Sequence, residues 1–120
     1  YIFGHNNAGQ LGRGNQVGDS ALASSPVTPI TNVSKVSLAG SNSSYIDTSD
    51  RLYTFGDNTY GQLGIGETVD FSWYYTHYFS STPTGVFSNI KDVSLGDHHT
   101  LMLSGSSITG NLYGYGNDRV

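Results

Sequence analysis

The chain has 120 residues, the size of one ordinary domain, of which only 12% are charged, and its formal net charge is -4 at pH 7. Its five lysines and arginines include no adjacent pair, so the clustered positive charge that nucleic-acid phosphates require is missing and we expect no nucleic-acid partner. The absence of cysteine excludes disulfides and thiolate metal sites, and no apolar run approaches the roughly 20 residues of a membrane span.

A glycine-rich segment opens the chain and then recurs. Residues 1–14 read YIFGHNNAGQLGRG and residues 53–66 read YTFGDNTYGQLGIG, with shared aromatic, asparagine, glycine, glutamine and leucine positions. A third copy starts with LYGYG at residues 112–116. Repeats at this spacing are typical of a solenoid, a β-propeller or another array. We therefore divide the chain into a first repeat at 1–52, a second at 53–112 and the start of a third at 113–120.

The segments between the glycine-rich motifs all predict short strands. VSKVSLAG at 33–40 and IKDVSLG at 90–96 are rich in β-branched residues, alternate in polarity and end at glycine. HTLMLS at 99–104 and NLYGYG at 111–116 add two strands, and short outer strands are expected near PVTPI and TPTGV. No segment has apolar residues at helical spacing. The prediction is an all-β fold of about two four-stranded antiparallel blades of a β-propeller.

Three stretches, YTFGDNTYGQLGIG, IKDVSLGDHHTLML and NLYGYG, resemble the repeat of the regulator of chromosome condensation family. The resemblance covers nearly the whole chain. It implies a propeller that has seven blades in typical members, of which this chain would supply about two. The first copy departs from the pattern twice: Ser43 stands where the second copy has the family's histidine, His99, and Ala39 adds a residue before Gly40.

We interpret the glycine-rich motif as structural rather than as a phosphate loop, because neither copy ends in Lys-Ser/Thr or precedes a helix. Its glycines are expected to hold backbone angles that a β-carbon forbids. Its leucines are expected to fill the gap between blades, and its asparagine and glutamine side chains to bond loop amides and carbonyls. The predicted core residues are Phe3, Leu11, Val36, Leu38, Phe55, Leu63, Val93 and Leu95.

Few residues suggest a catalytic or metal-binding site. The adjacent His98 and His99 invite a metal site, but neighbours on a strand point to opposite faces and no third ligand lies at a usual spacing. A Ser-His-Asp set arises here only by chance, because no nucleophile-elbow motif accompanies it. We therefore predict no catalytic, cofactor-binding or metal-binding residue, no small-molecule substrate and no enzymatic activity.

Residues 67–83 form an aromatic insertion, ETVDFSWYYTHYFSSTP, where the first repeat has NQVGDSALASSP. The insertion contains the only tryptophan of the chain. Such a segment either folds over its own blade as a local core, which is the favoured interpretation, or presents anchors to a protein partner, since Trp and Tyr dominate interface hot spots. The candidate partner-binding residues are Phe71, Trp73, Tyr74, Tyr75, His77, Tyr78 and Phe79.

Two N-x-S sequons make Asn32 and Asn42 candidate glycosylation sites in a secreted protein. Together with the low charge and the richness in Ser, Thr and Asn, they favour an extracellular or cell-surface protein. Because short sequons often arise by chance, an intracellular member of the family stays open.

Three function classes fit these observations. The favoured one is a non-catalytic scaffold or binding module that offers propeller loops to another protein. The second is a regulator of a small GTPase, for example in nucleotide exchange, which the resemblance implies for the founding family member and to which no residue here is matched. The third is an accessory domain of a larger enzyme. Because two blades leave broad faces unpacked, we expect the chain to be ordered only beside further blades or further copies of itself.

Overall fold

The computed structural model describes residues 8, 10–12, 30–64, 79–106 and 109–116, and the regular elements in that part of the chain are all β-strands. Four antiparallel strands in the order β1-β2-β3-β4 form a first sheet. They are β1 (Val33–Ala39), β2 (Asn42–Asp47), β3 (Leu52–Asp57) and β4 (Phe79–Phe87). The outer strand β4 has 9 residues and is therefore longer than the short outer strand expected from the sequence.

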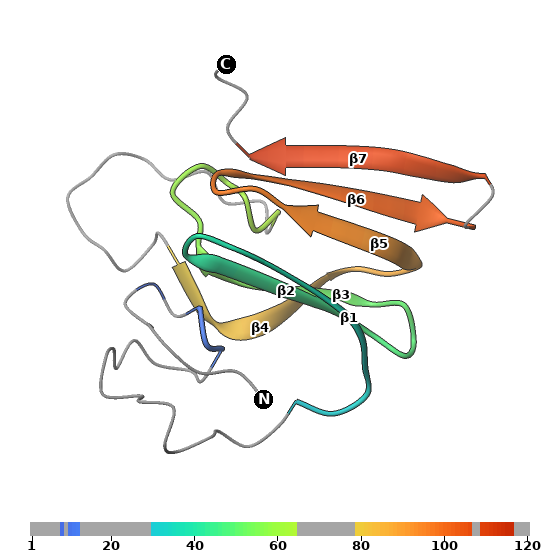
Figure 1. Cartoon of the computed structure of the whole chain (residues 1–120), viewed down its shortest axis with the longest axis horizontal. Helices are drawn as coiled ribbons and strands as arrows, with labels where there is room; N and C mark the ends of the chain where they lie inside the picture. Colours follow the sequence, from blue (N-terminus) through green and yellow to red (C-terminus); the bar gives the residue numbers. More distant parts are fainter. Residues whose placement is uncertain (1–7, 9, 13–29, 65–78, 107–108, 117–120) are drawn as a thin grey trace.

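A second antiparallel sheet contains three strands in the order β5-β6-β7. They are β5 (Ile90–Leu95), β6 (His99–Gly105) and β7 (Gly110–Gly116). The second sheet lies over the first, with β5 beside β1 and β2 (Figure 1). The all-β prediction is confirmed, and the two sheets correspond to the two predicted blades, the second with three strands among the described residues.

The hairpins β1-β2 and β5-β6 are copies of each other and share the same irregularity in strand pairing. A shift in the pairing register follows Val33 in β1 and Ile90 in β5. The residues before these strands, Asn32 and Asn89, both hold left-handed backbone angles, with φ of 59° and 57°. Asparagine tolerates this conformation better than most residues. Both pairs lie 57 positions apart, which is the structural offset between the two copies.

This offset corrects the alignment of the two copies made from the sequence. The structural equivalent of His99 is Asn42 and not Ser43, so the first turn contains no extra residue. A close backbone approach shows the same equivalence: a β-carbon on Gly56 would lie 2.8 Å from the Asn42 Cα, and one on Gly116 would lie 2.6 Å from the His99 Cα. Both glycines also have positive φ, 109° and 118°. Glycine is therefore required at each position for two reasons, the close backbone contact and the backbone angle.

The core lies between the two sheets. Its buried side chains come from β2, β3, β5 and β6 and are Ile46, Leu52, Ile90, Val93 and Met102. Partly buried side chains that pack against them are Phe87, Leu95 and Tyr115. The predicted burial is confirmed for Leu11, Phe55, Leu63 and Val93. Removing this apolar surface from water is the main force that holds the sheets together.

The predicted burial is wrong for two residues. Val36 and Leu38 are 66% and 61% exposed. Their equivalents Val93 and Leu95 lie against the first sheet, whereas no strand of the described residues covers the corresponding side of β1. Burial on these strands therefore depends on the neighbouring sheet, which the alternating strand pattern does not reveal. Phe3 lies outside the described residues.

Candidate functional site

The second glycine-rich motif forms a compact loop after β3, and its polar side chains bond the loop itself. Asn58 Oδ1 accepts from the Leu63 amide at 3.0 Å, and Gln62 Oε1 accepts from the Tyr60 amide at 2.8 Å. The Gln62 side-chain amide donates to Asp57 Oδ2 at 2.8 Å. These bonds satisfy groups that have no strand partner, as expected for the amide side chains of the motif.

The first motif repeats this geometry where the structure describes it. The Ala8 amide donates to Gln10 Oε1 at 2.9 Å, which matches the bond from Tyr60 in the second copy. Gly12 and Gly64 hold nearly equal positive φ, 65° and 67°. The predicted left-handed glycine conformations are confirmed at this pair of positions.

A hydroxyl group on a strand anchors each motif. The Ser43 hydroxyl donates to the Gln10 carbonyl, and the Thr100 hydroxyl donates to the Gln62 carbonyl, each at 2.8 Å. All four residues are buried, so these bonds form away from water, where an unpaired carbonyl is costly. Because its polar groups are engaged in this way, the motif positions the sheets and leaves little for a ligand to bind.

The loop edge, which we define as the loop after β3 together with the β5-β6 turn, presents two rings that the sequence reasoning missed. The ring centroids of Tyr60 and His98 lie 4.5 Å apart, and both side chains are exposed. We call these two residues the ring pair. The equivalent positions in the first copy are Ala8 and Ser41. Since the first copy builds the same loop and turn without rings, a comparison of the two copies would have pointed to this pair.

The two adjacent histidines have different surroundings. His98 contacts Tyr60, whereas the His99 ring lies over Gly96, where a β-carbon would collide with the imidazole. Among the described residues, no three His, Asp or Glu side chains gather closely enough to hold a metal ion.

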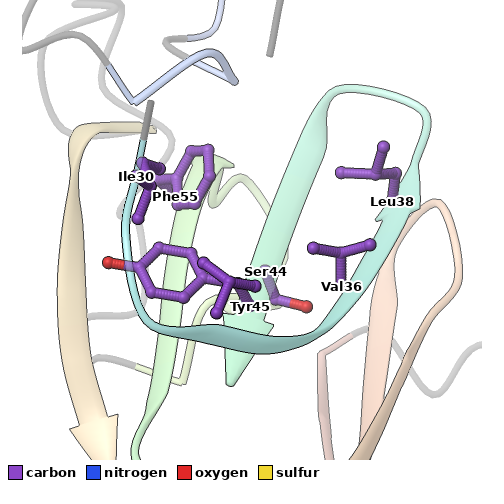
Figure 2. Close-up of a pocket in the computed structure, with 7 residues that line it drawn as sticks. Ile30, Val36, Leu38, Ser44, Tyr45 and Phe55 are labelled. Carbon is purple, nitrogen blue, oxygen red and sulfur yellow. The ribbon is translucent and has the colours of Figure 1, made fainter. Parts of the chain in front are cut away.

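The exposed side of β1 is part of an apolar surface on the first sheet. We call it the leading face and define it by Val36 and Leu38, which are exposed, and by Tyr45 and Phe55, which line the same pocket but are buried. It contains a pocket of about 190 Å³ whose lining also includes Ile30, Val33 and Ser44. Figure 2 shows Ile30, Tyr45 and Phe55 at one end of this pocket and Val36 and Leu38 at the other. Apolar surface of this kind is typical of an interaction site.

The second sheet has a matching apolar surface on its side away from the first sheet. We call it the trailing face and define it by Leu101, Leu103 and Leu112. Leu112 is 68% exposed and Leu101 is also exposed. The small residues of β7 allow these leucines to lie flat, because the Leu101 side chain sits over Gly114 and the Leu103 side chain over Gly110.

Two ion pairs cross from the first sheet to the second. Lys35 in β1 lies 3.5 Å from Asp92 in β5, and Lys91 in β5 bonds Asp50 in the β2-β3 turn. The side chains are partly exposed, so each pair contributes little to stability.

Burial and local bonds shift three pKa values. Burial raises the pKa of Tyr115 to about 12, and the nearby Thr100 hydroxyl offsets only part of this effect. Burial also raises the pKa of Tyr45, with a smaller contribution from Tyr53, whose ring stacks on it. Bonds from the backbone amides of Arg51 and Ser49 hold the pKa of Asp47 below its ordinary value.

Residues 67–78 of the aromatic insertion lie outside the described residues, and residues 79–83 belong to β4. Phe79 begins β4, where its backbone pairs with Asp57. The local core and the partner surface therefore both stay predictions for the other candidates, which are Phe71, Trp73, Tyr74, Tyr75, His77 and Tyr78.

The asparagine side chains of the two sequons differ in exposure to solvent. Asn32 is exposed, but Asn42 is buried and neither polar atom of its side chain has a hydrogen-bond partner. Glycosylation of Asn32 and of Asn42 both stay predictions. The described part of the chain also contains no helix that could cross a membrane.

Comparison with known proteins places these features in a family. Residues 49–103 match the model of the regulator of chromosome condensation (RCC1) repeat. The Protein RCC2 homolog of Danio rerio is 45% identical over 67 residues, which cover 53% of this chain and 13% of that protein. The X-linked retinitis pigmentosa GTPase regulator of Homo sapiens is 32% identical over 107 residues, which cover 87% of this chain and 10% of that protein. The chain thus spans about a tenth of the length of these relatives.

Solved structures show the same fold. The structure of yeast RCC1 (Prp20) bound to Kap60 superposes with a TM-score of 0.72 at 23% identity, covering 95% of this chain and 27% of that one. Human WBSCR16 superposes with a TM-score of 0.67 at 21% identity, covering 98% of this chain and 30% of that one. The two sheets therefore match part of a β-propeller. The relatives give no support to an extracellular location.

Proposed function

Because the chain belongs to the regulator of chromosome condensation repeat family, we propose that it is a non-catalytic β-propeller module that binds another protein through its loop edge. The observation that carries this proposal is the exposed ring pair of Tyr60 and His98. Aromatic side chains supply much of the binding energy at protein interfaces. The first copy forms the same loop and turn with Ala8 and Ser41, so the rings are surplus to the fold.

Two further observations support a binding role without chemistry. The buried polar side chains next to the loop edge, Gln62 and Thr100, are engaged in bonds within the fold. A serine or acid that must react needs an activating neighbour instead. Yeast RCC1 (Prp20), which shares the fold, was solved in complex with the protein Kap60.

The test uses site-specific photocrosslinking in cells that make the protein. A photoreactive residue replaces Tyr60 in one variant and Ser49 in the control, because Ser49 is exposed in the turn at the opposite end of β2. We expect covalent adducts with another protein at position 60 and few at position 49. The same adducts in a His98→Ala background should become scarcer. Adducts that form equally at both positions, or at neither, would contradict the proposal.

A second candidate, regulation of a small GTPase, is favoured by the similarity to the X-linked retinitis pigmentosa GTPase regulator. Yeast Prp20p has also been studied for its binding to Gsp1p. The two candidates differ in one measurement, the release of fluorescent GDP from purified small GTPases. A regulator that exchanges nucleotide accelerates this release, whereas a scaffold leaves it unchanged even when it binds.

A further inference from the structure

We propose that the ring pair is a pH-sensitive binding site, which binds an uncharged, apolar surface of a partner protein while His98 is neutral and releases it when His98 is protonated. This inference rests on the proposed function, because it concerns the same loop edge. Histidine is the side chain whose charge ordinarily changes between about pH 5 and pH 8. The proposal therefore adds a partner chemistry and a form of regulation to the site.

While His98 is neutral, the ring pair offers a partner two adjoining rings. The ring centroids of Tyr60 and His98 lie 4.5 Å apart, and the ring planes are tilted by 60°. Tyr60 is 42% exposed, and His98 is exposed as well. Both side chains have an apolar body and a polar tip. A partner that covers the rings therefore gains apolar contact and displaces water from only a few polar atoms.

The backbone on both sides of the ring pair is fixed before a partner arrives. The Tyr60 amide donates to Gln62 Oε1 at 2.8 Å. In the β5-β6 turn the Gly96 amide donates to the His99 carbonyl, also at 2.8 Å, and the His98 carbonyl lies against Gly116 of β7. Because the loop and the turn are already ordered, binding costs little conformational entropy.

The acids beside the loop edge are engaged in other contacts. The Asp97 carboxylate lies against Gly40 of the β1-β2 turn, where a β-carbon would be 2.9 Å from Oδ1. Both carboxylate oxygens of Asp57 accept bonds from side chains of its own loop. Among the described residues, His98 forms no ion pair. A proton on the His98 ring would therefore add a charge that is compensated mainly by water.

The other titratable groups near the turn do not supply a counter-charge either. The His99 ring lies over Gly96, and its protonation would add a second positive charge beside His98. Burial raises the pKa of Tyr115 in β7 to about 12, so this phenol stays neutral throughout the range in which histidines titrate. The β1-β2 turn contributes Gly40 and Ser41, which do not titrate.

Covering a protonated His98 is therefore unfavourable, because burial of a charge without a partner is costly. A partner that brought its own carboxylate would remove this cost. However, the two fixed charges beside the loop edge are Asp57 and Asp97, and they repel an acidic surface at neutral pH. An uncharged partner surface fits the neutral ring pair and cannot compensate the protonated one. Affinity should therefore fall as the pH falls.

The size of the effect follows from linkage between binding and protonation. If the complex accepts only the neutral imidazole, the affinity falls in proportion to the protein that is in the neutral form. For a histidine with the ordinary pKa of about 6.5, this gives a loss of up to about tenfold between about pH 7.5 and about pH 5.5.

The test titrates the whole 120-residue chain with a neutral probe, the peptide acetyl-Gly-Trp-Gly-amide, and follows the ring signals of Tyr60 and His98 by NMR. We expect the peptide to shift both sets of signals at about pH 7.5 and to bind up to about tenfold more weakly at about pH 5.5. Acetyl-Gly-Asp-Gly-amide should bind more weakly than the tryptophan peptide at the higher pH. Circular dichroism checks that the fold is kept at both pH values.

Two variants assign the pH dependence to one residue. His98→Phe keeps a ring against Tyr60 but cannot be protonated, so its affinity for the tryptophan peptide should be the same at both pH values. The matched control His99→Gln removes the neighbouring imidazole and should keep the fall in affinity.

The proposal is overturned if the wild type does not bind the tryptophan peptide, binds it equally at both pH values, or binds it more tightly at the lower one. It is also overturned if the fall persists in His98→Phe, if His99→Gln abolishes it, or if the aspartate peptide binds better at the higher pH. The proposed function is tested separately by the photocrosslinked adducts at position 60. A pH-independent peptide titration would therefore contradict this inference alone, and a lack of adducts would contradict the proposed function.

Discussion

Replacing valine with alanine at two structurally equivalent positions should lower the free energy of unfolding by very different amounts. Val93 on β5 is 8% exposed, and its equivalent Val36 on β1 is 66% exposed. Both residues lie on the edge strands of hairpins with the same register, so changes in strand propensity act equally on both. The difference between Val93→Ala and Val36→Ala therefore measures what the neighbouring sheet contributes.

The magnitude follows from burial. Valine to alanine removes two methyl groups, which are worth roughly 0.8 kcal/mol each when fully buried, and a cavity adds to this cost. We expect Val93→Ala to lower the free energy of unfolding by about 2 kcal/mol. At Val36 about two thirds of the side chain is already in water, so the loss should be about 0.5 kcal/mol.

Urea unfolding followed by far-UV circular dichroism gives both free energies, provided that the transition is two-state. The measurement is made at a concentration at which sedimentation shows a monomer. Equal losses in the two monomeric variants would refute the reasoning, because burial by the adjacent sheet would then have no energetic effect.

Thr100→Val keeps the side-chain volume but leaves the buried Gln62 carbonyl without its donor, and it should cost about 1 to 3 kcal/mol in the same urea assay. Gly56→Ala brings a β-carbon within contact of the backbone at Ser41 and should cost at least about 2 kcal/mol more than Gly61→Ala, which has positive φ but open space. Because burial raises the pKa of Tyr115 to about 12 from 10.0, the folded chain holds this proton more tightly than the unfolded chain. Stability should therefore fall by up to about 3 kcal/mol between pH 10 and 12, and Tyr115→Phe should remove that part of the fall in thermal melts.

The sequence predicted the strands and the role of the glycine-rich motif because both depend on local chemistry. Gly64 needs a positive φ, and Gln62 must bond the loop that contains it, wherever the neighbouring sheets lie. These requirements involve only a few neighbouring residues, so they can be recognised in the local sequence. The hydroxyl contacts of Ser43 and Thr100 were not predicted, because they join residues 33 and 38 positions away in the chain.

Burial was predicted poorly where it depends on a partner sheet. Val36 and Val93 have the same local sequence pattern, and only the position of the first sheet distinguishes them. The alignment error at His99 has a similar origin. Matching Gly40 with Gly96 looked natural in the sequence, although the first lies in a turn and the second precedes one. The ring pair was missed because no sequence motif predicts a contact between Tyr60 and His98.

The recurrence of the glycine-rich motif follows from how sequence repeats and sheets are offset. Residues 53–112 supply most of β3 and all of β4 to the first sheet, and then β5 and β6 to the second. The second sequence repeat thus contributes to both sheets, and the loop after β3 lies where they meet. From the first sheet it reaches across so that its Gln62 carbonyl accepts from Thr100 in β6, and Gly64 lies under the Tyr115 ring of β7. A β-carbon at Gly64 would lie 2.8 Å from that ring, so the contact requires glycine. Each of the two described sheets bonds one such loop, the first through Ser43 and the second through Thr100, so the motif recurs once per sheet. Unfolding of the second sheet would therefore release the loop that follows β3 in the first.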